Sequence, residues 1–183
     1  MPRLFFAIDL PQDVKEKIGP VAMSLRALGS HIKPVGREGM HLTMLFLGEQ
    51  PIDVLPDLMN IARCAVSPAR PCSVALGPTG FFPRVSFLTL VGEIETLVLV
   101  SRTLAEECRV FLEHPEDRPF KAHITIARHK QNIRPPEKAK IAGMFAPFEG
   151  MSWTCQELVL YKSDLTPRGP IYTALERFQF CNM

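Results

Sequence analysis

The sequence predicts an α+β fold in which two lobes, each a sheet with helices, face each other across a central cleft. Strand-like and helix-like segments alternate along the chain, which favours mixed architecture. Two similar tetrapeptides, His41-Leu42-Thr43-Met44 and His123-Ile124-Thr125-Ile126, lie in the two halves and suggest an internal duplication. The chain has 183 residues, 46% of them hydrophobic, which is enough for a packed core. We therefore expect a single domain spanning residues 1–183 and made of two interleaved lobes.

The first half is predicted to alternate between strands and helices. The apolar run Arg3–Asp9 is typical of a strand, and a helix over Gln12–Leu28 begins after Pro11 and stops at Gly29. The other elements predicted here are a short strand at His31–Val35, a strand at His41–Leu47 ended by Gly48, and a helix at Ile52–Val66.

The second half repeats this alternation. Two strands flank the turn-rich Gly77-Pro78-Thr79-Gly80, and an apolar stripe at near-helical spacing predicts a third helix. In order, the predicted elements are strands at Cys72–Leu76 and Val85–Val91, a helix at Ile94–Leu112, a loop at Pro115–Pro119, a strand at Ala122–Arg128, a helix from Pro135 to Phe145, and strands at Trp153–Tyr161 and Ile171–Phe180 around a turn at Thr166–Pro170.

The two tetrapeptides carry the chemistry. Side chains at i and i+2 of a strand point the same way, so His41 shares a face with Thr43, and His123 shares one with Thr125. The apolar residues between them point to the core. If both strands line one cleft, it holds two imidazoles and two hydroxyls, a set suited to hydrolysis of a phosphate ester by one acid and one base. The alternative is that both are buried strand histidines bonded to neighbouring hydroxyls.

Composition narrows the classes of protein. A net charge of +2 excludes a broad, non-specific nucleic-acid binder. Basic residues do gather around the second motif, where they form either a local basic rim for one phosphate or simply a solvated edge. Five scattered cysteines without a C-x-x-C pair argue against disulfides and zinc, and indicate free thiols in a reducing cytoplasm. No segment has the layout of a signal peptide or a membrane helix. The residues of the basic rim are Arg118, Lys121, Arg128, Lys130 and Arg134.

Four segments together resemble the two-histidine (2H) phosphoesterase superfamily, and within it the bacterial and archaeal RNA 2′,3′-cyclic phosphodiesterases, once named 2′-5′ RNA ligases. The resemblance spans nearly the whole chain, in the family's order. The segments are Arg3–Pro11, His41–Glu49, Arg118–Arg128, and Leu160–Leu165 followed by Gly169 and Tyr172.

The resemblance implies a bilobal α+β fold with antiparallel sheets, outer helices and the cleft between the lobes. It also implies hydrolysis of an RNA 2′,3′-cyclic phosphate to a 2′-phosphate, with reverse ligation in some members and without metal or cofactor. On this basis His41 is the proton donor and His123 the proton acceptor, while Thr43, Thr125 and Arg128 hold the phosphate. The expected partners are RNA ends or nucleotides that carry a cyclic phosphate, with no membrane, and the chain is expected to be a monomer.

Strict strand alternation gives further expectations. It places Leu45 on the face of His41 and turns Arg128 away from the cleft, unless the strand twists or ends before it. Phe46 is expected to pack in the core rather than stack on a base. Tyr172 and Lys162 are open between nucleotide contact and structural roles. We expect ordinary surface or loop histidines at His31, His114 and His129, and a core anchor at Trp153.

Three other functions stay open at this level. One keeps the chemistry but takes 2′,5′-oligonucleotides or a small cyclic phosphate such as that of ADP-ribose. Another is a nucleotide-binding module without catalysis, which the intact histidines and threonines disfavour. The third is a zinc hydrolase, disfavoured because carboxylate or Cys ligands at metal spacing are missing near the motifs.

Overall fold

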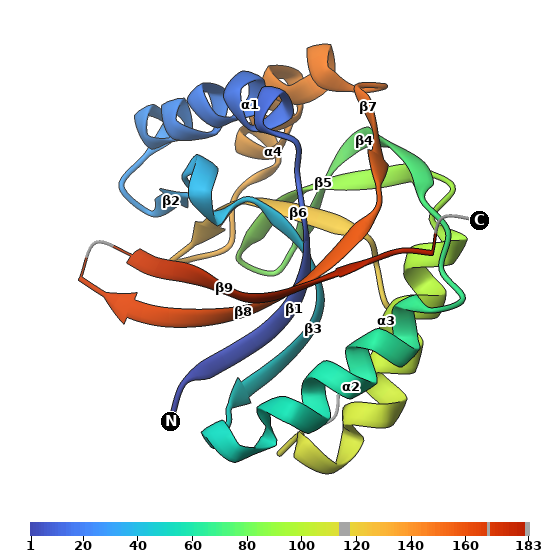
Figure 1. Cartoon of the computed structure of the whole chain (residues 1–183). Coiled ribbons are helices and arrows are strands. Elements are labelled where there is room, and N and C mark those ends of the chain that lie inside the picture. Colours follow the sequence, from blue (N-terminus) through green and yellow to red (C-terminus); the bar gives the residue numbers. More distant parts are fainter. Residues whose placement is uncertain (114–117, 168, 182–183) are drawn as a thin grey trace.

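The computed structural model describes residues 1–113, 118–167 and 169–181. In this part of the chain, antiparallel strands form one curled sheet with α-helices against it (Figure 1). In chain order the elements are β1 (Arg3–Asp9), α1 (Gln12–Ser24), β2 (Ile32–Pro34), β3 (His41–Glu49), α2 (Leu55–Val66), β4 (Cys72–Phe82), β5 (Val85–Gly92), α3 (Glu95–Glu107), β6 (His123–His129), α4 (Pro135–Phe145), β7 (Ser152–Cys155), β8 (Glu157–Thr166) and β9 (Gly169–Gln179).

The sheet consists of two halves that meet at the motif strands. The strand order is β7-β4-β5-β6-β3-β1-β8-β9, and β2 pairs with β6 beside this path. The halves are joined where β3 pairs with β6, at Leu42 opposite Ile124. The α+β class and the antiparallel strands are thus confirmed, and the two predicted sheets are continuous through this short junction.

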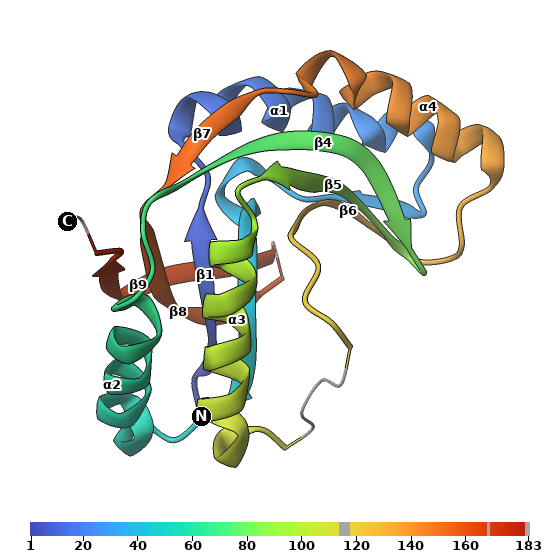
Figure 2. The same ribbon diagram turned by 90° about the vertical axis from the view of Figure 1, so that its right-hand side faces the viewer.

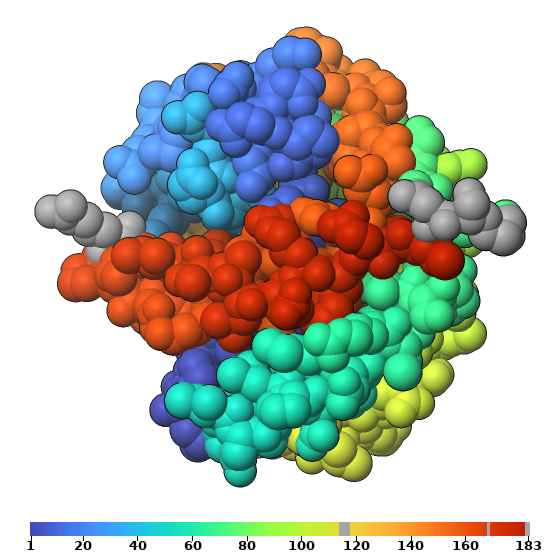
Figure 3. Space-filling view, in the orientation of Figure 1, coloured from blue at the N-terminus to red at the C-terminus, as the bar shows by residue number. Residues whose placement is uncertain are grey.

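The helices cover one face of each half. Figure 2 shows α1 and α4 above β4, β5 and β6, with α3 in front of β1 and β3 and α2 beside α3, next to β8 and β9. Apolar side chains between the sheet and these helices form one large buried cluster, which includes Leu42 and Ile124. Seen in the orientation of Figure 1, β8 and β9 run as a band between α1 and α2 (Figure 3). No described helix is long and apolar enough to cross a membrane.

Two predicted boundaries are wrong for physical reasons. The predicted turn at Gly77–Gly80 is a bulge inside β4, which continues to Phe82. Here a Cβ on Gly80 would lie 2.4 Å from the Phe87 ring, so glycine permits a close approach rather than a turn. The predicted strand Trp153–Tyr161 is two strands, because β7 pairs with β4 whereas β8 pairs with β1 in the other half.

The other elements agree with prediction to within a few residues. The first and third helices end in 3₁₀ turns, at Leu25–Leu28 and Cys108–Phe111, and Ile52–Val54 forms such a turn before α2. The strand ended by Gly48 in the prediction continues to Glu49. Residues 114–117 of the predicted loop region, including His114, and Arg168 in the last turn lie outside the described residues.

Candidate active site

The two motifs meet at the junction between the halves of the sheet. Continuing the antiparallel pairing from Leu42–Ile124 puts His41 opposite Thr125 and Thr43 opposite His123. Both motifs alternate between half-buried and buried residues, with the apolar ones in the helix-side core. The four polar side chains therefore share the helix-free, concave face, as the alternation predicts.

This register sets His41 and His123 diagonally across the junction. In a regular antiparallel pair, diagonal positions are about 7–8 Å apart. Because β3 and β6 pair only at this short junction, they diverge on either side of it. Such spacing leaves a place for a phosphate group between two imidazoles, with one threonine hydroxyl beside each.

His41 lies in an aromatic setting. Its ring is 4.9 Å from the ring of Phe5 and 5.2 Å from that of Tyr172, centroid to centroid. Burial lowers the pKa of His41 from 6.5 to about 4. The Asp9 carboxylate acts in the opposite direction and raises this pKa, whereas the positive charges of Lys15 and Arg128 lower it further. The free site therefore holds His41 as neutral imidazole near pH 7.

Asp9 is the carboxylate that faces His41, since the two are partners across β1 and β3. Its Oδ2 accepts a hydrogen bond of 2.5 Å from the Tyr161 hydroxyl. Lys15 Nζ lies 3.6 Å from Oδ1, and Arg177 lies 3.7 Å from Oδ2. Burial and this carboxylate together raise the pKa of Tyr161, so its hydroxyl stays a donor. Asp9 was not singled out as a site residue from the sequence, although it is the last residue of the first predicted strand.

His123 is oriented by the backbone. Its Nδ1 lies 2.7 Å from the carbonyl oxygen of Lys121. Because a carbonyl oxygen can only accept, Nδ1 carries the hydrogen, and the neutral ring keeps a free lone pair on Nε2. Edge-to-face contacts with Phe82 and Phe87, at 5.2 and 5.1 Å, fix the ring plane.

A bulge brings Arg128 to the same face. In the pairing of β5 with β6, Phe87 lies opposite Thr125 but Ser86 lies opposite Ala127, so Ile126 is an extra residue. This shift reverses the alternation after Ile126, so Arg128 lies on the same concave face as Thr125. Its charge lowers the pKa of both His41 and Tyr172, as expected for a guanidinium that faces this cleft. The orientation predicted by strict alternation is thus wrong, and the local twist that would allow Arg128 to reach the cleft is present.

Comparison with known proteins agrees with this arrangement. Residues 11–167, which include both motifs, match the model of the 2′-5′ RNA ligase superfamily. The chain belongs to this superfamily. A protein of Thermus thermophilus named RNA 2′,3′-cyclic phosphodiesterase is 33% identical over 96% of this chain and 89% of its own length. The protein of the same name from Escherichia coli is 26% identical, over 96% and 95%.

Solved structures agree as well. A Thermus thermophilus crystal structure has a TM-score of 0.79 at 30% identity and covers 97% of each chain. Escherichia coli LigT complexed with 3′-AMP has a TM-score of 0.74 at 26% identity and covers 99% of each chain. The resemblance to 2H phosphoesterases predicted from the sequence is therefore confirmed.

In this 2′-5′ RNA ligase superfamily member, Leu45 and Phe46 exchange their predicted places. A bulge at Met44 puts Leu45 opposite Phe6 and Phe46 opposite Phe5. Phe6 belongs to the helix-side core, whereas Phe5 lies on the concave face in a separate small cluster. Leu45 accordingly packs against the core, and Phe46 is half exposed on the site's face.

The other residues considered from the sequence have mixed outcomes. Tyr172 lies at the site, with its ring against that of His41. Lys162 instead forms an ion pair with Asp164, at 3.0 Å. Its strand partner Leu4 belongs to the helix-side core, so Lys162 lies on the face away from the site.

His129 is buried rather than at the surface, and a hydrogen bond of 2.8 Å joins it to Ser86. His31 is half buried and lies 3.1 Å from Glu137. Trp153 packs against the main core as expected.

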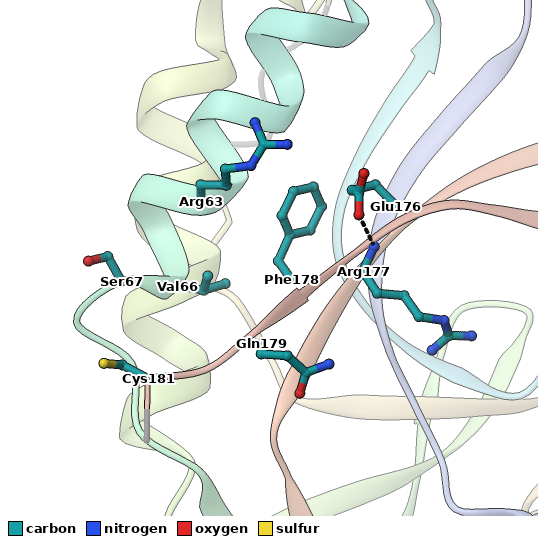
Figure 4. A pocket seen from close by; sticks show the side chains of 8 residues that line it. All are labelled: Arg63, Val66, Ser67, Glu176, Arg177, Phe178, Gln179 and Cys181. Carbon is teal, nitrogen blue, oxygen red and sulfur yellow. Dashed lines mark hydrogen bonds between the residues drawn. The ribbon is translucent and has the colours of Figure 1, made fainter. Parts of the chain in front are cut away.

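Two further features lie apart from the motif residues. A surface hollow of about 370 Å³ lies on the helix side, between α2 and β9 (Figure 4). The ring of Phe178 lies at its centre and belongs to the main core. The guanidinium carbon of Arg63 is 5.9 Å from the centroid of this ring. Among the described residues, no three His, Cys, Asp or Glu side chains converge as metal ligands. The concave face therefore remains the candidate active site.

Proposed function

We propose that this chain hydrolyses RNA 2′,3′-cyclic phosphate ends to 2′-phosphates by acid–base catalysis with two histidines and no metal. The observation that carries the proposal is the pairing of β3 with β6 at Leu42 and Ile124. Regular strand geometry extended from this pair would put His41 and His123 diagonally on one face, with a threonine opposite each. The relatives named RNA 2′,3′-cyclic phosphodiesterase support the substrate class.

His123 is assigned as the base. Water attacks phosphorus in line with the ribose 3′-oxygen, and the free Nε2 of His123 takes the proton of that water. The hydrogen bond from Nδ1 to Lys121 holds the ring in the tautomer that this role needs. The roles of the two histidines exchange in the reverse reaction, and a 5′-hydroxyl in place of water gives a 2′-5′ linkage.

His41 is assigned as the acid. It gives a proton to the 3′-oxygen as the bond between phosphorus and that oxygen breaks, leaving the phosphate on the 2′-oxygen. Its low pKa in the free site requires a source of negative charge, which the bound phosphate and Asp9 supply by favouring the imidazolium. The hydroxyls of Thr43 and Thr125 donate to the non-bridging oxygens, and Arg128 adds positive charge.

The deciding experiment measures hydrolysis of a nucleoside 2′,3′-cyclic phosphate and of a short RNA with a cyclic end, in excess chelator. Wild type should give a 2′-phosphate, and His41→Ala and His123→Ala should each lose at least about 10²-fold in kcat. Unchanged rates in both variants would contradict the mechanism. A wild type that is inactive on both substrates would contradict the proposed substrate class and favour 2′,5′-linked oligonucleotides or small cyclic phosphates.

A further inference from the structure

The concave face carries an exposed aromatic ring with a cation over it, outside the motifs. Phe46 is 50% exposed, and the guanidinium carbon of Arg3 lies 5.3 Å from its ring centroid. Both residues come from the two strands that also hold His41 and Asp9. A flat ring beside an arginine is the combination that binds unstacked bases of single-stranded RNA.

The backbone is built to put Phe46 there. Two bulges flank it, one at Met44 and one at Leu47, where Gly48 takes a φ of 75°. Without the first bulge, alternation would send Phe46 into the helix-side core. Although single exposed apolar residues are common on protein surfaces, this one lies on the functional face because of an irregularity in the strand.

Phe46 lies across the strand from a row of contacting rings that reaches His41. Phe5 is the strand partner of Phe46, and its ring lies against that of His41. Tyr172 contacts both Phe5 and His41, and the charge of Arg3 lowers the pKa of Tyr172, so Arg3 borders the same row.

The length of this row sets which base it can reach. The base of the reacting nucleotide is joined to the ribose that carries the cyclic phosphate, so it stays within one sugar of the histidines. Phe46 follows His41 by five residues, which separates their Cα atoms by roughly 13–16 Å at about 3.3 Å per residue. That distance fits the neighbouring nucleotide better than the reacting one.

We propose that Phe46 and Arg3 form a subsite for the base of the nucleotide that precedes the cyclic-phosphate end. The inference rests on the function proposed above and deepens it, because it makes an RNA chain a better substrate than a mononucleotide. Glu49 is the strand partner of Arg3 and puts a negative charge on the neighbouring strand, so we assign the binding to stacking rather than to phosphate attraction.

The test compares three substrates that share one reacting nucleotide. They are cytidine 2′,3′-cyclic phosphate, a dinucleotide with a 2′,3′-cyclic end, and the same dinucleotide with an abasic first residue. Each is assayed with wild type, Phe46→Ala, Phe46→Leu, and Val110→Ala as a matched control, since Val110 is 84% exposed on the 3₁₀ turn after α3. Thermal unfolding verifies that all four proteins are folded.

We expect wild type to have a kcat/KM on the order of tenfold higher for the intact dinucleotide than for the other two substrates. Phe46→Ala and Phe46→Leu should both lose this preference while turning over the mononucleotide as wild type does, and Val110→Ala should keep it. Equal preference in wild type and Phe46→Ala overturns the subsite but leaves the proposed function intact. No turnover of any substrate by wild type overturns the proposed function itself.

Discussion

Phe46 and Arg128 occupy matching places in the two halves of the sheet. Each follows its motif histidine by five residues, and each reaches the concave face because a bulge falls on the last residue of its tetrapeptide. The bulged residues, Met44 and Ile126, have carbonyl oxygens that the strand ladders do not use in the regular way. Each of these oxygens accepts a hydrogen bond from outside the ladder, from the Ser101 hydroxyl at 2.8 Å and from the Val35 backbone at 2.9 Å.

The first prediction concerns Ser101, a buried residue of α3. Ser101→Ala leaves the Met44 carbonyl without its donor, so we expect the free energy of unfolding to fall by about 1–3 kcal/mol. Because this bulge orients the strand that carries His41, kcat should fall as well. Urea unfolding and kinetics with a cyclic nucleotide measure both effects, and exposed Ser67→Ala is the control. A Ser101→Ala protein as stable as wild type would show that the bulge does not depend on this bond.

The second prediction concerns Arg128. Arg128→Gln keeps much of the side chain's length but removes the charge, so we expect weaker binding of inorganic phosphate and of cyclic nucleotides, by roughly tenfold. The same change removes a charge that lowers the pKa of His41, so this pKa should rise. Isothermal titration with phosphate measures the first effect, and NMR titration of the imidazole measures the second. Exposed Arg102→Gln, on α3, should change neither.

Sequence periodicity predicted the faces of both tetrapeptides correctly but failed for the residues that follow them. His41, Thr43, His123 and Thr125 precede the bulges, so the period of two holds for them. The bulges leave no clear mark in the sequence, since Met44 and Ile126 are ordinary strand residues. Gly48 did mark an irregularity, which was interpreted as the end of a strand rather than a second bulge.

The third prediction separates His129 from the motif histidines. It is buried on the helix side of the sheet and bonded to Ser86, so His129→Ala leaves a cavity and an unpaired hydroxyl. We expect the free energy of unfolding to fall by about 2–3 kcal/mol, with kcat within about twofold of wild type. Denaturant unfolding and kinetics test this pair of outcomes. A loss of kcat as large as that of His123→Ala, in a protein shown to be folded, would place His129 in the catalytic machinery instead.

The last prediction follows from the burial of His41. Its pKa is about 4 in the folded protein and near 6.5 in the unfolded chain, so between these values the unfolded state binds more protons. The contribution of buried, neutral His41 to the free energy of unfolding is therefore complete above pH 6.5. It is lost as the pH falls toward 4, by up to about 2–3 kcal/mol. His41→Gln removes this contribution, so its unfolding free energy should depend less on pH across that range. The lowered pKa of His129 leaves a smaller dependence of the same sign in both proteins. Urea unfolding at several pH values between 7.5 and 4.5 measures the difference, and parallel curves would show that His41 is not held neutral. NMR of the wild-type imidazole should independently give a midpoint near pH 4 that rises when phosphate binds, because an anion beside the ring favours its charged form.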